Sequence, residues 1–427
     1  MNQRKIKAVN TTRFQASFML VGLVWLACAT LTQAAGKAAH PANATGTAAA
    51  VSGSTDLLLY NPINGSATYG TLYADGHFLT AAYHPPYSWT RGWSHIVKTN
   101  GVLFFYRESD GLWATSRADQ NGYATTLRSG YTGIAKIGQG LVDVVSTPNG
   151  ILICRGGPRR DTQYAGGGIV GQVGNDGSFR VTYAGNFAAW AKVVYTPNGL
   201  VFYKSNYLGT GYVAVGRIQP NGAFVQTYSS TLAGQWLENE VIAVGNDLVF
   251  LAYAHYVHVF PETTFNHVTG RYRVGGITSS GQFALRSELC SPALAGGFLV
   301  PTVIGNDLFL YAAEDTVFSP DDPSLFTDSF TRLVQSGWGM VASFGGSGIF
   351  YPNPSCRGKL IIKQEHSEGS FGNGYKIIST ANGIFFYHPT FGSVRVGSFD
   401  VDGNFIETQN IPNWLDPGYR MVVNVTD

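Results

Sequence analysis

One short phrase recurs along the chain, and this repetition restricts the possible folds more than any other feature. It reads "GWSHIVKTNGVLFFYR" at residues 92–107, "WAKVVYTPNGLVFYK" at residues 190–204 and "GYKIISTANGIFFYH" at residues 374–388. In each copy, two short runs rich in β-branched and aromatic residues flank a loop that contains Asn-Gly. Two such runs across a short glycine-containing loop predict an antiparallel β-hairpin.

A second hairpin follows the first in the complete units. The segment "YVAVGRIQPNGAFVQTY" from Tyr212 turns at Pro220-Asn221-Gly222, and "VRVGSFDVDGNFIETQ" from Val394 turns at Asp402-Gly403. Two linked hairpins predict a four-stranded antiparallel sheet. Since a lone sheet of this size cannot cover both of its faces, the units must stack, and radial stacking gives an all-β fold of the β-propeller type.

The number of blades is predicted from the start of the second run of each hairpin, which recurs at intervals of 35 to 60 residues. These starts are Asp56, Gly101, Gly150, Gly199, Asp247, Asp307, Gly348 and Gly383. They predict about eight four-stranded blades, with seven as the alternative because the sixth and seventh units are irregular. Residues 57–60 and 419–423 lack partner runs beside them, so we expect the last strand to pair with the first blade and close the ring.

The N-terminal part of the sequence divides the chain into three predicted segments. Residues 1–34 resemble a secretory signal peptide, with basic residues before an apolar run and a small-x-small pattern at its end. A retained membrane anchor and a lipid-modified Cys28 are weaker alternatives, because the apolar run is short for a membrane span and its context is atypical of a lipobox. Residues 35–55 are rich in Ala, Gly, Ser and Thr and predict a flexible tether, which leaves residues 56–427 for the propeller.

Charge and cysteine content exclude several classes of function. The whole chain carries a formal net charge of +2, and the leader contributes four of its basic residues and no acidic ones. The remaining chain is therefore slightly acidic, which gives no electrostatic basis for binding nucleic acid or an anionic membrane. Cys154, Cys290 and Cys356 have no metal-ligand spacing, and one disulfide, such as Cys290 with Cys356, can form among them.

The repeats "GWSHIVKTNGVLFFYRESDG" and "WAKVVYTPNGLVFYKSNYLG", each followed by a glycine-rich second hairpin, resemble those of tachylectin-type β-propeller lectins. The resemblance extends over most of residues 56–427 at the level of the repeat pattern. It implies a secreted, non-catalytic protein that binds N-acetylated amino sugars at several equivalent sites near the blade junctions. The carbohydrate or glycoconjugate would then be its partner, and we expect a monomer without cofactor, metal or a membrane span in the mature chain.

The loops opposite the short hairpin turns carry the candidate ligand-binding residues. Exposed aromatic rings beside Arg and Asp suit a sugar, which offers an apolar face for stacking and hydroxyls for hydrogen bonds. The predicted ligand-binding residues are Tyr87, Trp89, Arg107, Asp110, Arg155, Tyr207 and Tyr256.

Three other groups of residues are weaker candidates for a catalytic or metal-binding site. Glu238 and Glu240 share one face of a strand, but nothing beside them in sequence argues for the raised pKa that a glycosidase acid needs. His255 and His258 face opposite sides of a strand, and the acidic residues near Asp321 lack the spacing of a calcium loop. No catalytic residue is therefore predicted, and the alternatives are a secreted propeller enzyme acting on polysaccharide, a glycosidase or lyase, or a protein-binding adhesin or scaffold.

Overall fold

The computed structural model describes part of the chain. The described residues are 53–119, 122–135, 142–156, 166–188, 190–205, 210–233, 236, 240–252, 270–286, 290–294, 299–305, 307–312, 339–344, 360–366, 370–372 and 374–426. The chain divides into two units, Met1–Ala49 and Ala50–Asp427, and every described residue belongs to the second. The predicted leader and most of the predicted tether lie outside the described residues.

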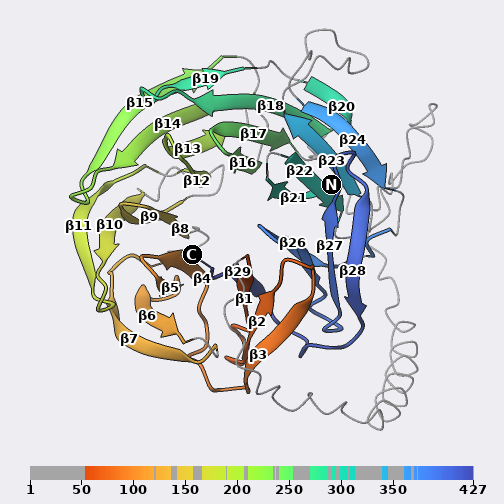
Figure 1. Cartoon of the computed structure of the whole chain (residues 1–427). Helices are drawn as coiled ribbons and strands as arrows, with labels where there is room; N and C mark the ends of the chain where they lie inside the picture. The colour runs from red at the N-terminus through yellow and green to blue at the C-terminus, as the bar shows by residue number, and fades with distance from the viewer. Residues whose placement is uncertain are drawn as a thin grey trace, which may run out of the picture. The chain divides into compact units, whose positions relative to one another are not determined.

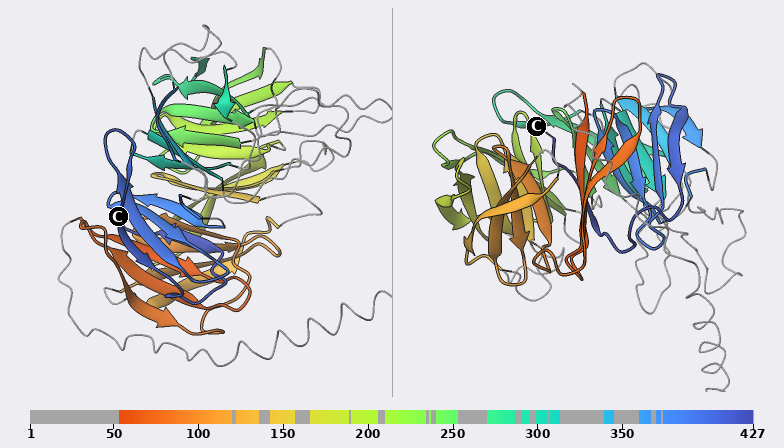
Figure 2. Two further views of the ribbon diagram at one scale, coloured as in Figure 1. Left: turned by 90° about the vertical axis from the view of Figure 1, so that its right-hand side faces the viewer. Right: turned by 60° about the horizontal axis from the view of Figure 1, so that its bottom comes forward.

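The second unit is a β-propeller, with no helix among the residues described. Its strands form six four-stranded antiparallel blades and one five-stranded sheet, arranged around a ring (Figure 1). The innermost strand of each sheet contacts the innermost strand of the next, and these contacts continue around the full circle. The two further views show the sheets standing side by side around the ring (Figure 2).

The strands of each blade are named in order from the innermost, at the ring centre, to the outermost. Blade one contains β29 (Met421–Asn424), β1 (Thr55–Tyr60), β2 (Ala67–Leu72) and β3 (Phe78–His84). Blade two contains β4 (His95–Thr99), β5 (Val102–Arg107), β6 (Leu112–Ala118) and β7 (Ala124–Tyr131). Blade three contains β8 (Val142–Thr147), β9 (Gly150–Arg155), β10 (Gly167–Val173) and β11 (Phe179–Asn186). Blade four contains β12 (Lys192–Thr196), β13 (Gly199–Ser205), β14 (Gly211–Ile218) and β15 (Phe224–Leu232).

The remaining three sheets include the five-stranded one. Blade five contains β16 (Glu240–Val244), β17 (Asp247–Ala252), β18 (Gly270–Ile277) and β19 (Phe283–Leu285), with β20 (Cys290–Leu294) also paired to β18. Blade six contains β21 (Leu299–Ile304), β22 (Asp307–Ala312), β23 (Gly339–Phe344) and β24 (Leu360–His366). Blade seven contains β25 (Lys376–Thr380), β26 (Gly383–Tyr387), β27 (Val394–Phe399) and β28 (Phe405–Ile411).

The predicted count of eight blades is not confirmed. The sequence assigned a unit of its own to the segment around Gly348, but β23 pairs with β22 and is the third strand of blade six. What was counted as two irregular units is therefore one blade with long insertions. Gly348 itself lies outside the described residues.

The predicted closure is confirmed. Strand β29 pairs antiparallel with β1, so that Val423 lies opposite Leu58 and Met421 opposite Tyr60. Blade one is therefore built from both ends of the propeller sequence, and the inner edge of β1 is covered.

The Asn-Gly turns of the repeated phrase do more than reverse the chain. In each of four inner hairpins the asparagine Nδ2 donates a hydrogen bond to a backbone carbonyl on the third strand of the next blade. The bonds are Asn100 to Val173 (3.0 Å), Asn149 to Ile218 (2.8 Å), Asn198 to Ile277 (2.7 Å) and Asn382 to Leu72 (3.0 Å). The last one connects blade seven to blade one and so strengthens the closure.

A tyrosine near the end of the second strand fixes the connection that leads into the next blade. The buried hydroxyl-bearing side chains of Tyr60, Tyr311 and Tyr387 donate to the carbonyls of Thr90 (2.7 Å), Gly372 (2.8 Å) and Asp416 (2.7 Å), and Tyr106 donates to Ile134. Cys154 and Leu251 occupy the same register in blades three and five. These bonds fix the connections that surround the ring centre on one rim.

Candidate active site

The innermost strands carry charged or titratable side chains at one repeated position. This position lies directly opposite the second-strand tyrosine, or the residue that replaces it, in the antiparallel register. The residues that occupy it in five blades are His95, Asp143, Lys192, Glu240 and Lys376, which we call the charged row. Because the blades share one register, the charged row lies at one level of the ring centre, near the start of the innermost strands.

Two members of the charged row, Lys192 and His95, each lie beside a carboxylate. Lys192 Nζ and Glu240 Oε1 are 2.5 Å apart and connect blades four and five. His95 Nε2 lies 3.7 Å from Glu108 Oε2, and the backbone N–H of Glu108 donates to the hydroxyl of Ser94 (2.8 Å). Water and salt screen the half-buried Lys192–Glu240 ion pair much less than they screen pairs on the open surface.

Three members of the row, Asp143, His95 and Lys376, have shifted pKa values, and burial lowers that of Lys376. Burial raises the pKa of Asp143 to about 6, and the carboxylates of Glu240 and Glu108 add to this while the charge of Lys192 opposes it. Burial lowers the pKa of His95, although the neighbouring Glu108 acts in the other direction. A carboxyl group whose pKa is raised toward neutrality and a histidine whose pKa is lowered, on neighbouring innermost strands, are typical of sites that transfer protons.

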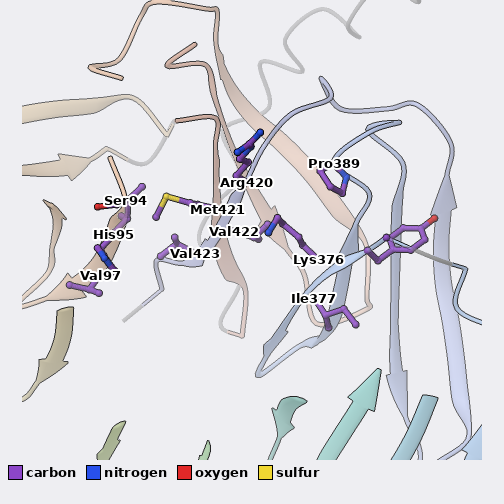
Figure 3. Close-up of a pocket in the computed structure, with 13 residues that line it drawn as sticks. Ser94, His95, Val97, Lys376, Ile377, Pro389, Arg420, Met421, Val422 and Val423 are labelled. Carbon is purple, nitrogen blue, oxygen red and sulfur yellow. The ribbon is translucent and has the colours of Figure 1, made fainter. Parts of the chain in front are cut away.

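A cavity of about 570 Å³ opens beside the charged row. Its lining includes His95 and Ser94 from the start of blade two, Tyr375 and Lys376 from blade seven, and Arg420 to Val423 from blade one. Figure 3 shows His95 on one side of the segment Arg420–Val423 and Lys376 on the other. A volume of this size is sufficient for a small organic ligand.

The predicted binding residues fall in different surroundings. Arg107 and Asp110 form a bidentate pair, with Nε to Oδ1 at 2.9 Å and Nη2 to Oδ2 at 2.6 Å, so these two charged groups already satisfy each other. This pairing raises the pKa of Arg107 and lowers that of Asp110. Arg155 donates to the carbonyls of Ala135 (2.7 Å) and Gly133 (3.3 Å) and so stabilises a connection.

Two of the predicted aromatic residues, Tyr87 and Trp89, lie in the connection between β3 and β4, and they differ in exposure. Tyr87 is 73% exposed with a φ of 69°, and the guanidinium of Arg91 lies 5.4 Å from its ring centroid. Trp89 is half-buried, and the centroid of its ring lies 5.3 Å from that of His84 and 5.6 Å from that of Phe105. Tyr207 and Tyr256 lie outside the described residues. Among the described candidates, Arg107 contacts Asp110 directly and approaches Tyr87 only through Arg91, whose carbonyl accepts a hydrogen bond from Arg107 Nη1 (3.3 Å).

The remaining sequence candidates are either elsewhere or not described. Glu238, His255, His258, Asp321 and Cys356 all lie outside the described residues. Cys154 is a buried free thiol, and burial raises its pKa. Within the described ranges, no three His, Cys, Asp or Glu side chains are grouped so as to hold a metal ion, and no helix is long and apolar enough to cross a membrane.

Sequence reasoning missed most of the charged row, although the signal was present in the repeated phrase. His95, Lys192 and Lys376 occupy one aligned position in the three quoted copies, immediately before the apolar pair of the first run. Glu240 was named only as part of a glycosidase pair with Glu238, whereas the structure pairs it with Lys192. The informative pattern is one aligned position in the repeats whose residue is charged or titratable in most copies but differs in the sign of its charge.

Comparison with protein-family models and with curated sequences finds no match. Among solved structures, the chain is similar to a propeller from Bacteroides fragilis provisionally named a 6-phosphogluconolactonase, with a TM-score of 0.56 and 12% identity, over 88% of this chain and 99% of that one. A protein of the same provisional name from Bacteroides uniformis gives 0.55 and 11%, over 87% and 99%. The periplasmic gluconolactonase of Pseudomonas aeruginosa gives 0.51 and 14%, over 87% and 99%.

These comparisons confirm the propeller fold and contradict the predicted function. These three propellers bear the names of lactone hydrolases, which contradicts the predictions of a non-catalytic lectin and of a chain that is not an enzyme. Nothing in the comparisons supports tachylectin-type repeats in particular. The physical reason for the error is that the repeat pattern encodes blade geometry, which propellers of unrelated function share.

Proposed function

We propose that this chain is a hydrolase that opens sugar lactones at the cavity beside the charged row. The observation that carries the proposal is the charged row itself: the imidazole of His95 and the carboxyl group of Asp143, each with a shifted pKa, are placed at one level of the ring centre by the blade register. The names of the similar propellers supply the reaction class.

Lactone hydrolysis requires a proton to leave the attacking water and another to reach the departing ring oxygen. Water adds to the carbonyl carbon, the bond between that carbon and the ring oxygen breaks, and a hydroxy acid results. His95 suits the role of general base, because its lowered pKa keeps it neutral near pH 7 and Glu108 can stabilise the imidazolium that forms.

Asp143 suits the role of general acid, which donates a proton to the departing ring oxygen. It lies on β8, which neighbours β4 at the ring centre, and its pKa of about 6 leaves a fraction of the side chain protonated near neutrality. Lys192, held by Glu240, stands on the other side of Asp143 in the charged row and contributes positive charge there.

The segment boundaries complete the proposal. We assign residues 1–34 to an export leader, residues 35–55 to a tether and residues 56–427 to the catalytic propeller. A periplasmic propeller among the similar structures supports export. We also propose that the protein acts as a monomer, since blade one is completed within the chain.

The test is an assay of lactone hydrolysis by the purified full chain, with the spontaneous rate subtracted. We expect hydrolysis of glucono-δ-lactone or of a phosphorylated or carboxylated relative, and a fall of about 10²-fold or more in kcat/KM for His95→Gln. Arg180→Gln, on the exposed outer strand β11, is the matched control and should retain wild-type activity. If the wild-type rate equals the buffer rate for every lactone in the panel, the proposed function is wrong.

A further inference from the structure

Two cations line the cavity from neighbouring blades. Lys376 begins β25 of blade seven, and Arg420 immediately precedes β29 of blade one. Both contribute to the lining of the same cavity, whose described lining includes no Asp or Glu. The backbone of Arg420 is fixed by a hydrogen bond from its N–H to the carbonyl of Tyr60 (3.0 Å).

Neither cationic group is neutralised within the described residues. No hydrogen bond or ion pair there involves Lys376 Nζ or the Arg420 guanidinium, whereas Lys192 and Lys363 each have a carboxylate partner. Burial lowers the pKa of Lys376, and the nearby charge of Arg420 lowers it further. The two like charges, on the half-buried Lys376 and the exposed Arg420, repel each other, and an anion bound between them would relieve this repulsion.

We propose that Lys376 and Arg420 bind an oxyanion group on the substrate, a phosphate or a carboxylate, remote from the lactone carbonyl. This inference rests on the proposed function. With the anionic group at Lys376 and Arg420, the lactone would extend past the segment Arg420–Val423 toward His95, which lines the same cavity (Figure 3). The substrate class would therefore be lactones of sugar phosphates or of sugar diacids, not neutral sugar lactones.

The chemistry of the pair suits this role. A guanidinium offers two parallel donors to an oxyanion, and an ammonium adds a compact positive charge. Charge-assisted hydrogen bonds of this kind favour an anionic substrate over its neutral analogue by roughly tenfold to a hundredfold.

The experiment compares three lactones on four proteins. The substrates are 6-phosphoglucono-δ-lactone, glucaro-1,4-lactone and neutral glucono-δ-lactone, and the proteins are wild type, Lys376→Gln, Arg420→Gln and the control Arg180→Gln. A second measurement, calorimetric titration with inorganic phosphate, detects the anion site without requiring any activity.

We expect wild type to prefer one of the two anionic lactones by about tenfold or more in kcat/KM. Lys376→Gln and Arg420→Gln should remove this preference and weaken phosphate binding, while Arg180→Gln changes neither. The favoured anionic lactone identifies the group as phosphate or carboxylate.

The two proposals can fail separately. Equal rates on all three lactones in wild type and variants would overturn the inference and leave the proposed function intact, even if free phosphate binds. Phosphate binding that depends on both cations, without hydrolysis of any lactone, would support the anion site and overturn the hydrolase. The absence of both would overturn both.

Discussion

The two ends of the innermost strands carry the same backbone register but opposite kinds of sequence. At the turn end, Asn100, Asn149, Asn198 and Asn382 repeat one residue and one bond to the next blade. At the other end, the equivalent positions hold an imidazole, carboxylates and ammonium groups. A repeated residue at a repeated position maintains the ring, and a changing residue at a repeated position is free to perform chemistry.

The largest effect concerns the ring on which both ends depend. Deleting residues 415–427 removes β29 together with the buried Leu415 and Tyr419, and it exposes the inner edge of β1. We expect the truncated protein to lose its cooperative thermal transition and to associate, as seen by circular dichroism and size-exclusion chromatography. A truncated monomer with an unchanged melting curve would show that β29 is dispensable.

A smaller effect is expected at the charged end, where a substitution should raise the free energy of unfolding instead of lowering it. The pKa of Asp143 is about 6 in the folded protein and near 3.8 for the free side chain, so the folded state binds its proton more tightly. The free energy of unfolding therefore falls as the pH rises between these values, and the ionised carboxylate costs stability above pH 6. Asp143→Asn removes this cost while it removes the proposed acid.

We expect Asp143→Asn to be more stable than wild type by about 1–2 kcal/mol at pH 7.5, with little difference at pH 4. Urea unfolding at the two pH values measures this, and the lactone assay should show reduced turnover. Lys192, Glu240 and Glu108 supply the charges that act on this carboxylate, so their protonation must be the same in both proteins. A variant that is less stable at pH 7.5 would assign Asp143 a structural role instead.

The turn end should respond in the opposite way. Asn198→Ala removes the 2.7 Å bond from Nδ2 to the carbonyl of Ile277 and leaves that carbonyl without this donor. We expect a loss of about 1 kcal/mol in the free energy of unfolding with no change in kcat/KM. Asn221→Ala, in the outer turn of the same blade, controls for the general effect of replacing a turn asparagine. An activity defect in Asn198→Ala alone would break the separation between the two ends.

The smallest effect is expected on the loop that the sequence favoured. Tyr87 is exposed, so Tyr87→Ala should change the free energy of unfolding by less than about 0.5 kcal/mol, measured by urea unfolding. Trp89→Ala should cost more, because its ring packs beside His84 and Phe105. If lactone turnover falls in Tyr87→Ala, the site extends from the cavity onto this loop.

The fold could be predicted from the sequence because hairpin signals are local. Alternating apolar runs and Asn-Gly turns specify each hairpin, and the unpaired runs at residues 57–60 and 419–423 specify the closure. The number of blades could not be counted in the same way, since long insertions in blade six divided one sheet into two apparent units. Only the pairing of β23 with β22 resolves this.

The site was harder to predict because its members are distant in sequence and ordinary in isolation. His95 and Asp143 belong to different blades, and their pKa shifts arise from burial, which no local pattern reports. Arg107 and Asp110 attracted attention as neighbouring charges in a loop, yet they satisfy each other. Comparing aligned positions across repeats, rather than charges within one loop, would have led to the charged row.

The pairing of β29 with β1 also governs when the protein can fold. Blade one needs residues from both ends of the propeller sequence, so the ring cannot close until β29 has been synthesised. Until then the inner edge of β1 stays open. Closure of the ring is therefore a late event in folding, because its last strand is among the last to be made.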